Sequence, residues 1–515
     1  MPTDFDQYST AKPLLSALPA WINSEFDQKR IAAYQLYEEI YWTAPESFKL
    51  ETRGQDAFPI YVPAGRIIVE TMNRYLANAM TVTVDPEFGS DTEKALANQV
   101  MTDLVRRERF YSRFAANKRY GIIRGDWLWH LYADPLRPPG ARISIFPIDP
   151  ASYFPILNPD NLDEIIGAHI VDQFLGEGEQ GLEKGKAYIR RLTYRKATEA
   201  GGPSPITAED AIYEVDAWGG PNMDEKIVKQ ISTVHQLPPP IDSLPIYHIQ
   251  NFFEPGSPWG SSEMRGLERI MAAVNQTISD EDLTLAMDGL GVYATNAGQP
   301  IDPDTGEDAG WNLGPARVVE VPHESFFNRV SGTGSVTPYQ DHLAYLHEQI
   351  DLATGGGQIA RGRVTDVQVA ESGVAMLIEL APIINLAVEK EQVVTDVMTN
   401  MLFDLAKWYV AYEGSAFNSL MEVTRWVPAY GPKIPPNDQK QFDNIMAMVV
   451  NKVIPMEVAW DMLRTLGYEL PENTEMMGKL LSETQATATV EADAMATRIN
   501  GEIQQTDALA APGAQ

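Results

Sequence analysis

Cysteine is absent from this 515-residue chain, and basic residues are scarce. Without cysteine, disulfides and thiolate metal sites are excluded, which fits a reducing compartment or a protein that is stable without covalent crosslinks. The 71 acidic residues outnumber the 40 basic ones, and the formal net charge is −31. Nucleic-acid binders usually present a basic surface to phosphates, so we expect any contact with DNA to be weak, sliding or repulsive. An acidic surface that only keeps the protein dissolved is the alternative interpretation.

Long hydrophobic runs are also missing. No stretch of about 18 uncharged apolar residues occurs, so no membrane span is predicted, and the most apolar run, residues 374–386, is interrupted by Glu379 and Pro382. The N-terminus has no basic region followed by an apolar run, so no signal peptide is expected. Hydrophobic residues still make up 44% of the chain, which is enough to bury a sizeable core. The length fits roughly three domains or one large elaborated domain.

Sequence motifs for catalysis are not found. Residues 181–186 come nearest to a phosphate-binding loop, but their spacing is wrong and the Ser or Thr that would hold Mg²⁺ is missing. Residues 354–357 are rich in glycine, but they follow a predicted helix rather than a strand and make a poor dinucleotide loop. None of the seven histidines stands at a zinc-ligand spacing. We therefore predict no catalytic residue, no cofactor and no metal site.

The period of the apolar residues divides the chain into helical and strand-rich parts. The fold class that it predicts is α+β, predominantly helical. The predicted helices are residues 24–40, 66–80, 91–114, 261–288, 337–352 and 374–412, one or two helices within 438–466, and 471–499. The predicted strands are residues 127–132, 142–146, 186–195, 211–218, 227–234, 291–294, 317–321 and 420–426. Pro382 is expected to kink the helix that contains it, and residues 504–515 are expected to be disordered.

The predicted helix 261–288 has a narrow apolar seam and an N-cap candidate in Ser261 or Ser262. The seam residues step by three and four along the sequence, and they are Met264, Leu267, Met271, Val274 and Ile278. Such a seam packs either inside its own chain or against an identical helix of a neighbouring subunit. The sequence leaves both arrangements open.

Five short segments carry a resemblance to a known family. They are residues 126–128 leading to 148–155, residues 246–251, residues 258–263 (PWGSSE), residues 275–280 (NQTISD) and residues 371–376 (ESGVAM). Each segment alone is a weak signal, but their order and spacing together are fairly specific. Over residues 30–430 the chain resembles the portal proteins of tailed double-stranded DNA bacteriophages, which are ring subunits around the channel for the viral genome.

The resemblance implies a portal fold with wing, stem, clip and crown, and a cyclic ring of about twelve copies. The implied parts are a wing at 1–260, a first stem helix at 261–288, a clip at 289–336, a second stem helix at 337–354, a tunnel loop at 355–373, a long kinked helix and wing strand at 374–437, crown helices at 438–500, and a disordered tail at 501–515. Twelve chains of −31 would carry a formal charge of roughly −370.

Two residue groups would then face the channel, and a third would allow the tunnel loop to move. Asp280, Glu281 and Asp282 are candidates for an acidic wall that repels phosphate, with an ordinary solvated helix face as the alternative. Arg361 and Arg363 would form a basic ring on the tunnel loop that touches DNA without reading its sequence, or they would pair with acids of a neighbouring subunit. The candidate hinge residues are Gly355, Gly356, Gly357, Gly373 and Pro382.

The resemblance also implies the partners and the location of the protein. The partners would be further copies of the chain, the major capsid protein, the scaffolding protein, the terminase large subunit, a head–tail adaptor protein, and double-stranded DNA that passes without sequence specificity. The protein would lie at the capsid portal vertex of the virion, after assembly in the host cytoplasm, and would not be an enzyme. Two alternatives stay open: another virion structural component, and an acidic cytosolic α+β enzyme without a recognisable motif.

Overall fold

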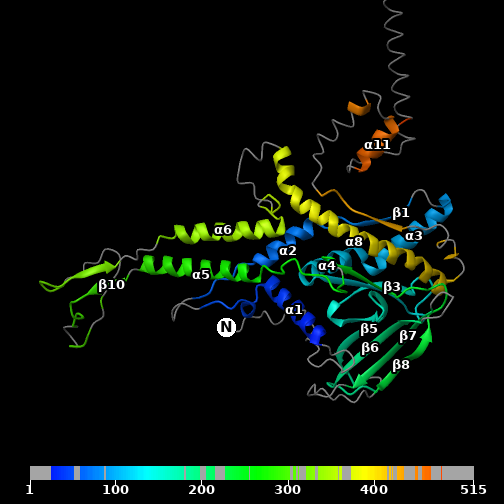
Figure 1. The fold of residues 1–515 in the computed structure, drawn as a ribbon, viewed down its shortest axis with the longest axis horizontal. Coiled ribbons are helices and arrows are strands. Elements are labelled where there is room, and N and C mark those ends of the chain that lie inside the picture. The colour runs from blue at the N-terminus through cyan, green and yellow to red at the C-terminus, as the bar shows by residue number, and fades with distance from the viewer. Residues whose placement is uncertain are drawn as a thin grey trace, which may run out of the picture. The chain divides into compact units, whose positions relative to one another are not determined.

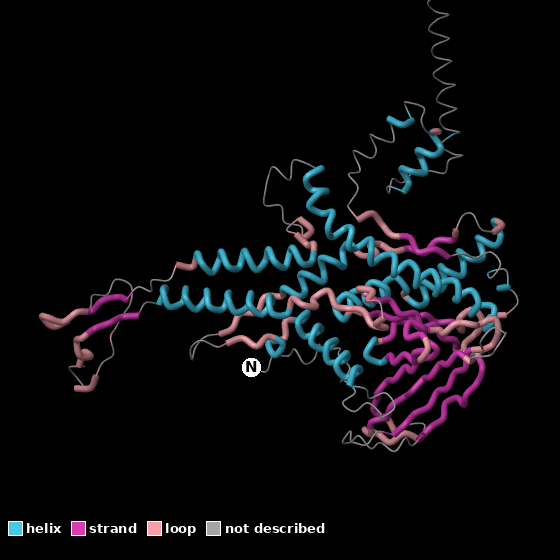
Figure 2. The backbone as a smooth tube through the Cα atoms, viewed as in Figure 1, coloured by secondary structure: helices cyan, strands magenta, loops and turns pink. Residues whose placement is uncertain are grey.

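The chain forms two compact units in the computed structural model, residues 1–431 and residues 432–515. The residues that the structure describes are 25–51, 58–85, 89–178, 181–197, 205–214, 227–254, 256–290, 292–301, 306–308, 311, 321–330, 335–357, 359–361, 373–414, 417–418, 420, 426–433, 447–449, 455–465 and 477. Among the described residues, 46% are helical and 24% lie in strands, and Figure 2 shows both kinds of element. The predicted α+β class is confirmed, with more helix than sheet in this part of the chain.

Four helices open the first unit (Figure 1). They are α1 (Glu25–Trp42), α2 (Ala64–Tyr75), α3 (Asp91–Glu108) and α4 (Phe110–Arg124). A capping box at Ser90 and Glu93 starts α3, because each side chain binds the other residue's backbone amide. The prediction of one helix over 91–114 is wrong at Arg109, whose φ of +50° breaks the helical path between α3 and α4.

A three-stranded antiparallel sheet of order β3-β2-β9 lies against α4. Its strands are β2 (Asp126–Ala133), β3 (Ile143–Ile148) and β9 (Ile246–Gln250). Trp127 and Trp129 on β2 are buried and meet the rings of Phe110 and Phe114. Gly121 on α4 allows the close approach, since a Cβ there would lie 2.5 Å from the indole of Trp127. This aromatic contact fixes β2 at the centre of the unit.

A second antiparallel sheet has five strands in the order β4-β5-β6-β7-β8. They are β4 (Tyr153–Asn158), β5 (Asn161–Leu175), β6 (Ala187–Lys196), β7 (Ile206–Glu214) and β8 (Ile227–Gln236). Sequential strands pair throughout, which makes the sheet a meander. The predicted strands at 186–195 and 227–234 correspond to β6 and β8, whereas the 15 residues of β5 were not predicted.

Two long helices run side by side away from the sheets, joined at their far end through a short two-stranded sheet (Figure 1). They are α5 (Glu268–Leu290) and α6 (Thr337–Thr354), and the pair is called the hairpin below; the short strands are β10 (Val292–Thr295) and β11 (Phe327–Val330). Helix α6 has the predicted bounds, but α5 begins at Glu268 rather than at residue 261. Gly266 has a φ of +85°, which helical backbone does not allow, so residues 261–267 form turns instead.

The 41-residue helix α8 (Gly373–Glu413) crosses the first unit and contains Pro382. A two-stranded sheet of β1 (Thr81–Val84) and β12 (Trp426–Ala429) lies beside it. Most of the strand predicted at 420–426 lies outside the described residues; at its ends, Leu420 is helical and Trp426 is the first residue of β12. In the second unit the structure describes α11 (Met456–Thr465), within the predicted helical range 438–466. The helix predicted at 471–499 and the tail lie almost entirely outside the described residues.

The short 3-10 helices η2 (Pro45–Ser47) and η3 (Pro150–Ser152) complete the described elements of the first unit. The strand predicted at 317–321 lies mainly outside the described residues. Over the described part of the chain, no helix is both long enough and apolar enough to cross a membrane.

Candidate functional site at the base of the hairpin

Helix α5 is held to the rest of the first unit by side chains of the segment 275–280. The Oδ1 atom of Asn275 accepts a hydrogen bond from the amide of Val62 at 2.8 Å, and the Ser279 hydroxyl accepts one from the amide of Ile60 at 2.8 Å. Residues four apart lie on one helix face, so both reach the same extended strip of backbone. Asn275 is fully buried, and the polar pattern of this segment therefore fastens the hairpin in place.

The apolar seam predicted on this helix packs inside the chain over most of its length. Met264, Leu267, Met271 and Val274 are buried in the isolated chain, whereas Ile278 is half-buried. Met264 and Leu267 precede the helix, in the turns that lead to it. Of the two arrangements left open by the sequence, the structure shows core packing for the four buried residues. A neighbouring subunit could meet this seam only at Ile278 and beyond.

The acidic triplet on α5 turns around the helix, because successive residues are about 100° apart. Asp280 accepts a hydrogen bond from Gln276 on its own helix at 3.0 Å. Glu281 faces α6, where the Nε2 atom of Gln340 donates to it at 3.2 Å. Asp282 is exposed. The three carboxylates thus do not share one surface, and Asp282 is the member open to solvent.

The first residues after α6, up to Arg361, are held to α6 and α2 by side-chain contacts. Arg361 forms an ion pair with Asp351 on α6, and each side chain is 18% exposed. The hydroxyl of Tyr75 on α2 donates to the carbonyl of Ala360 at 3.4 Å. The sequence left open whether Arg361 meets DNA or an acid of a neighbouring subunit; the structure instead pairs it with an acid of its own chain. Arg363 lies outside the described residues.

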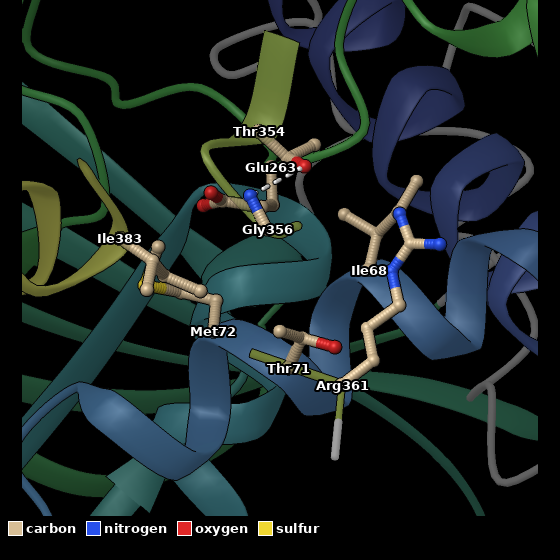
Figure 3. Close-up of a pocket in the computed structure, with 8 residues that line it drawn as sticks. All are labelled: Ile68, Thr71, Met72, Glu263, Thr354, Gly356, Arg361 and Ile383. Atoms are coloured by element: carbon tan, nitrogen blue, oxygen red, sulfur yellow. Dashed lines mark hydrogen bonds between the residues drawn. The ribbon is translucent and has the colours of Figure 1, made fainter. Parts of the chain in front are cut away.

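A small pocket, lined in part by Arg361, lies between α2, α6 and α8 (Figure 3). Its lining residues are Ile68, Thr71, Met72, Glu263, Thr354, Gly356, Arg361 and Ile383. The pocket offers about 10 Å³ to the centre of a water-sized sphere, which is room for about one water. It is too small for a nucleotide or a metabolite.

The candidate hinge glycines differ in their surroundings. Gly355 ends α6 with a φ of +63°, and the amide of Gly356 donates to the Thr354 hydroxyl at 3.2 Å in a buried position. A Cβ at Gly357 would meet open space. Gly373 is the first residue of α8. Of the three glycines that follow α6, Gly357 therefore has the most room for a side chain.

Three of the segments that carried the family resemblance meet at the carboxylate of Asp126, which is completely buried. Its Oδ1 atom accepts from His248 Nε2 and from the amide of Gly260, both at 2.7 Å. Its Oδ2 atom accepts from the Tyr34 hydroxyl at 2.5 Å. Burial, reinforced by the negative charge of Asp126, raises the pKa of Tyr34 well above its usual value, so Tyr34 stays a donor. Residues far apart in sequence are thus joined by one buried acid.

A second buried charge holds α8 to the same region. Lys390 forms an ion pair with Glu263, and both side chains are almost fully buried. Asn251 completes the group, because its amide donates to Glu263 at 3.1 Å and its carbonyl accepts from Lys390 at 3.2 Å. Burial lowers the pKa of Lys390 against the opposing effect of Glu263. The sequence indicated Glu263 and Asn251 as motif positions but gave no partner for either.

Two further histidines, His130 and His169, have lowered pKa values. Burial lowers the pKa of His130 to about 3, with a smaller contribution from Arg190, and its Nε2 atom lies 3.0 Å from the Tyr194 hydroxyl. Burial likewise lowers the pKa of His169 to about 4, and its Nδ1 atom lies 2.9 Å from the Thr193 hydroxyl. Both rings are therefore neutral at pH 7 and serve packing. In the same part of the chain, no group of three or more acidic or histidine side chains is arranged to hold a metal ion.

Comparison of the sequence with protein-family models and with curated proteins gave no match.

Proposed function

We propose that this chain is the portal subunit of a tailed double-stranded DNA bacteriophage, a ring component without an active site of its own. The observation that carries the proposal is the path of the chain at the hairpin. Helix α5 leads to a distal two-stranded sheet, α6 returns antiparallel to α5, and the chain then continues to the 41-residue helix α8. This order is what the family resemblance implies for stem, clip, second stem helix, tunnel loop and long helix.

The hairpin has the features that a ring wall needs. Helix α6 buries only Leu346, Ile350 and Thr354 among its 18 residues, so much of its surface is left for contacts with other copies. The bonds from Asn275 and Ser279 hold α5 to the body, which would keep the wall rigid while a duplex passes. The exposed carboxylate of Asp282, repeated around a ring, would repel phosphate. DNA would then slide along the wall instead of adhering to it.

In the virion the ring would occupy one capsid vertex, in contact with the major capsid protein and, during assembly, the scaffolding protein. The distal sheet of β10 and β11 would dock the terminase large subunit first and the head–tail adaptor protein later. Energy for packaging would come from the terminase, because the described residues offer no phosphate-binding loop of their own. The pairing of Arg361 with Asp351 leaves Arg363 as the better candidate for backbone contact with DNA.

The decisive experiment is to measure the mass of the purified assembly in solution and to image it in two-dimensional class averages. We expect a large cyclic oligomer with a central hole. A monomer or dimer at all salt and protein concentrations would overturn the proposal and favour the acidic enzyme. An oligomer without a central hole would favour another virion structural component.

A genetic test addresses the DNA contact separately. In a phage that depends on this chain, Arg363→Ala should leave ring assembly intact and alter packaging or DNA retention. Unchanged DNA filling in that variant would remove Arg363 from the DNA-contact role while leaving the ring itself in place.

A further inference from the structure

Two exposed helix faces of this chain carry complementary charges. The first lies on α2, whose exposed residues are Arg66, Ile67 and Arg74. These positions fall within about 100° of the helix circumference. Neither arginine has a hydrogen bond or ion pair among the described residues. This surface is called the α2 arginine face below. It is basic, although the chain as a whole has a net charge of −31.

The second face is a stripe along α6. Asp341, Tyr345, Glu348 and Leu352 are all exposed and follow each other at spacings of four, three and four residues, which places them on one side of the helix. Tyr345 is 54% exposed and Leu352 is 72% exposed. Asp341 and Glu348 have no partner within the described part of the chain. This surface, called the α6 acidic stripe below, combines two acids with two large apolar side chains.

The spacing of the charges on the two faces agrees. Asp341 and Glu348 are seven residues apart, about 10.5 Å along the helix, and Arg66 and Arg74 are eight residues apart, about 12 Å. Both pairs flank apolar side chains that are unusually exposed, with Ile67 at 41% between the arginines. Burying these side chains against each other would add a hydrophobic contribution that the isolated chain lacks.

The α2 arginine face lies near the base of the hairpin, where α6 ends beside α2 (Figure 1), and the α6 acidic stripe runs from there toward the far end of α6. Thr71 of α2 and Thr354 of α6 line one pocket at this base. The two faces lie on different helices of the same chain, so they are suited to a head-to-tail contact in which each copy contributes one face to each neighbour. Such a contact closes into a ring when the rotation between copies allows it.

We propose that the α6 acidic stripe of one copy packs on the α2 arginine face of the next copy. The occupant of each face is thus a second copy of this chain. The inference deepens the ring proposed above and rests on it, because a head-to-tail contact has a function only in an assembly. The ion pairs would be Asp341 and Glu348 with the neighbour's two arginines, around an apolar centre of Tyr345, Leu352 and Ile67.

Charge reversal tests the contact. We expect Arg66→Glu/Arg74→Glu and Asp341→Arg/Glu348→Arg each to weaken assembly by at least about a hundredfold, because like charges would face each other. Mixing the two variants should restore assembly. The acidic stripe of the α2 variant then meets the arginine face of the α6 variant, and the stripe of the α6 variant, now basic, meets the α2 face of the other variant, now acidic. The chain with all four reversals should assemble alone. Native mass spectrometry and sedimentation velocity measure each result.

The control variant is Arg195→Glu/Lys196→Glu, which changes the net charge as much as the α2 variant does, at exposed positions on β6. It should assemble like the wild type, and circular dichroism should show that every variant is folded. Wild-type assembly with no effect of the reversals, or with no rescue on mixing, overturns this interface but leaves the ring proposal standing. A wild type that stays monomeric overturns both.

Discussion

Gly355, which ends α6, lies directly against Pro382 of α8. A Cβ atom at Gly355 would be 3.3 Å from the Cβ of Pro382 and 3.3 Å from the amide nitrogen of Ile383. The sequence indicated both residues independently as hinge points, one for its backbone freedom and the other as a helix breaker. In the structure they form one contact at the base of the hairpin, so the end of α6 is tied to the proline of α8.

Gly355→Ala should therefore destabilise the first unit by about 1–3 kcal/mol, because a φ of +63° disfavours an L side chain and the added methyl group has little space. Gly357→Ala is the matched control, since a Cβ there meets open space, and its effect should stay within about 0.5 kcal/mol. Urea unfolding followed by tryptophan fluorescence measures both. Equal effects of the two substitutions would show that the contact with Pro382 contributes nothing.

Removing one partner of the buried pair Lys390–Glu263 should cost about 3–5 kcal/mol, because the other charge remains buried alone. We expect Lys390→Met and Glu263→Gln each to show this loss in urea unfolding. The double variant should be more stable than the sum of the single losses indicates, by a coupling energy of at least about 1 kcal/mol. Strictly additive losses would mean that the two side chains do not interact in solution.

Asp351→Ala and Arg361→Ala should both increase the mobility of the backbone at residues 355–361. Each substitution removes one partner of the ion pair that holds this segment to α6. Hydrogen–deuterium exchange at the amides of residues 355–361 should become faster by a similar factor in both variants, roughly threefold to tenfold for a partly exposed pair. Protection lost in only one of them would assign Arg361 a different partner.

Acid should destabilise the protein in part through His130. Its pKa is lowered to about 3 in the folded state by burial, whereas the unfolded value is about 6.5. Between these values the unfolded chain binds a proton that the folded chain does not, so the stabilising contribution is complete above pH 6.5 and is lost as the pH falls toward 3. One such group gives a slope of about 1.4 kcal/mol per pH unit.

The double substitution His130→Phe/Tyr194→Phe removes this titration together with the hydrogen bond between the two side chains. The free energy of unfolding should then fall less steeply between pH 6 and pH 4 than in the wild type. If the double variant kept the wild-type slope, another group would carry the acid sensitivity.

Local periodicity was sufficient to predict the elements that depend on one helix or strand at a time. The bounds of α6, β6 and β8 follow closely from apolar spacing and from the turn residues around them. The break at Arg109 was not predictable in this way, because a non-glycine residue with positive φ is stabilised by packing between α3 and α4 rather than by its own sequence. Gly266 was a visible signal that α5 starts late, but the apolar period runs through it.

The sequence did not allow us to predict which charged and polar side chains bind each other. Asp126, His248 and Gly260 stand in three separate motifs, and only the folded sheet brings them within hydrogen-bonding distance. Arg361 and Asp351 are ten residues apart, with a glycine-rich break between them, so no helical spacing relates them. The seam on α5 could equally have packed between subunits, since a period identifies a buried face without saying which chain buries it.

The fastening of α5 at Asn275 and Ser279 has a mechanical consequence. Up to Ser279 the helix is gripped by buried packing and by bonds to the backbone of Val62 and Ile60. Beyond it, the described contacts of α5 outside its own helix include those with α6, among them the contact between the hydroxyls of Thr284 and Tyr339 at 3.4 Å. The hairpin is thus a cantilever clamped at one end. A force applied at its tip would bend the outer half and reach the sheets as torque at the clamp.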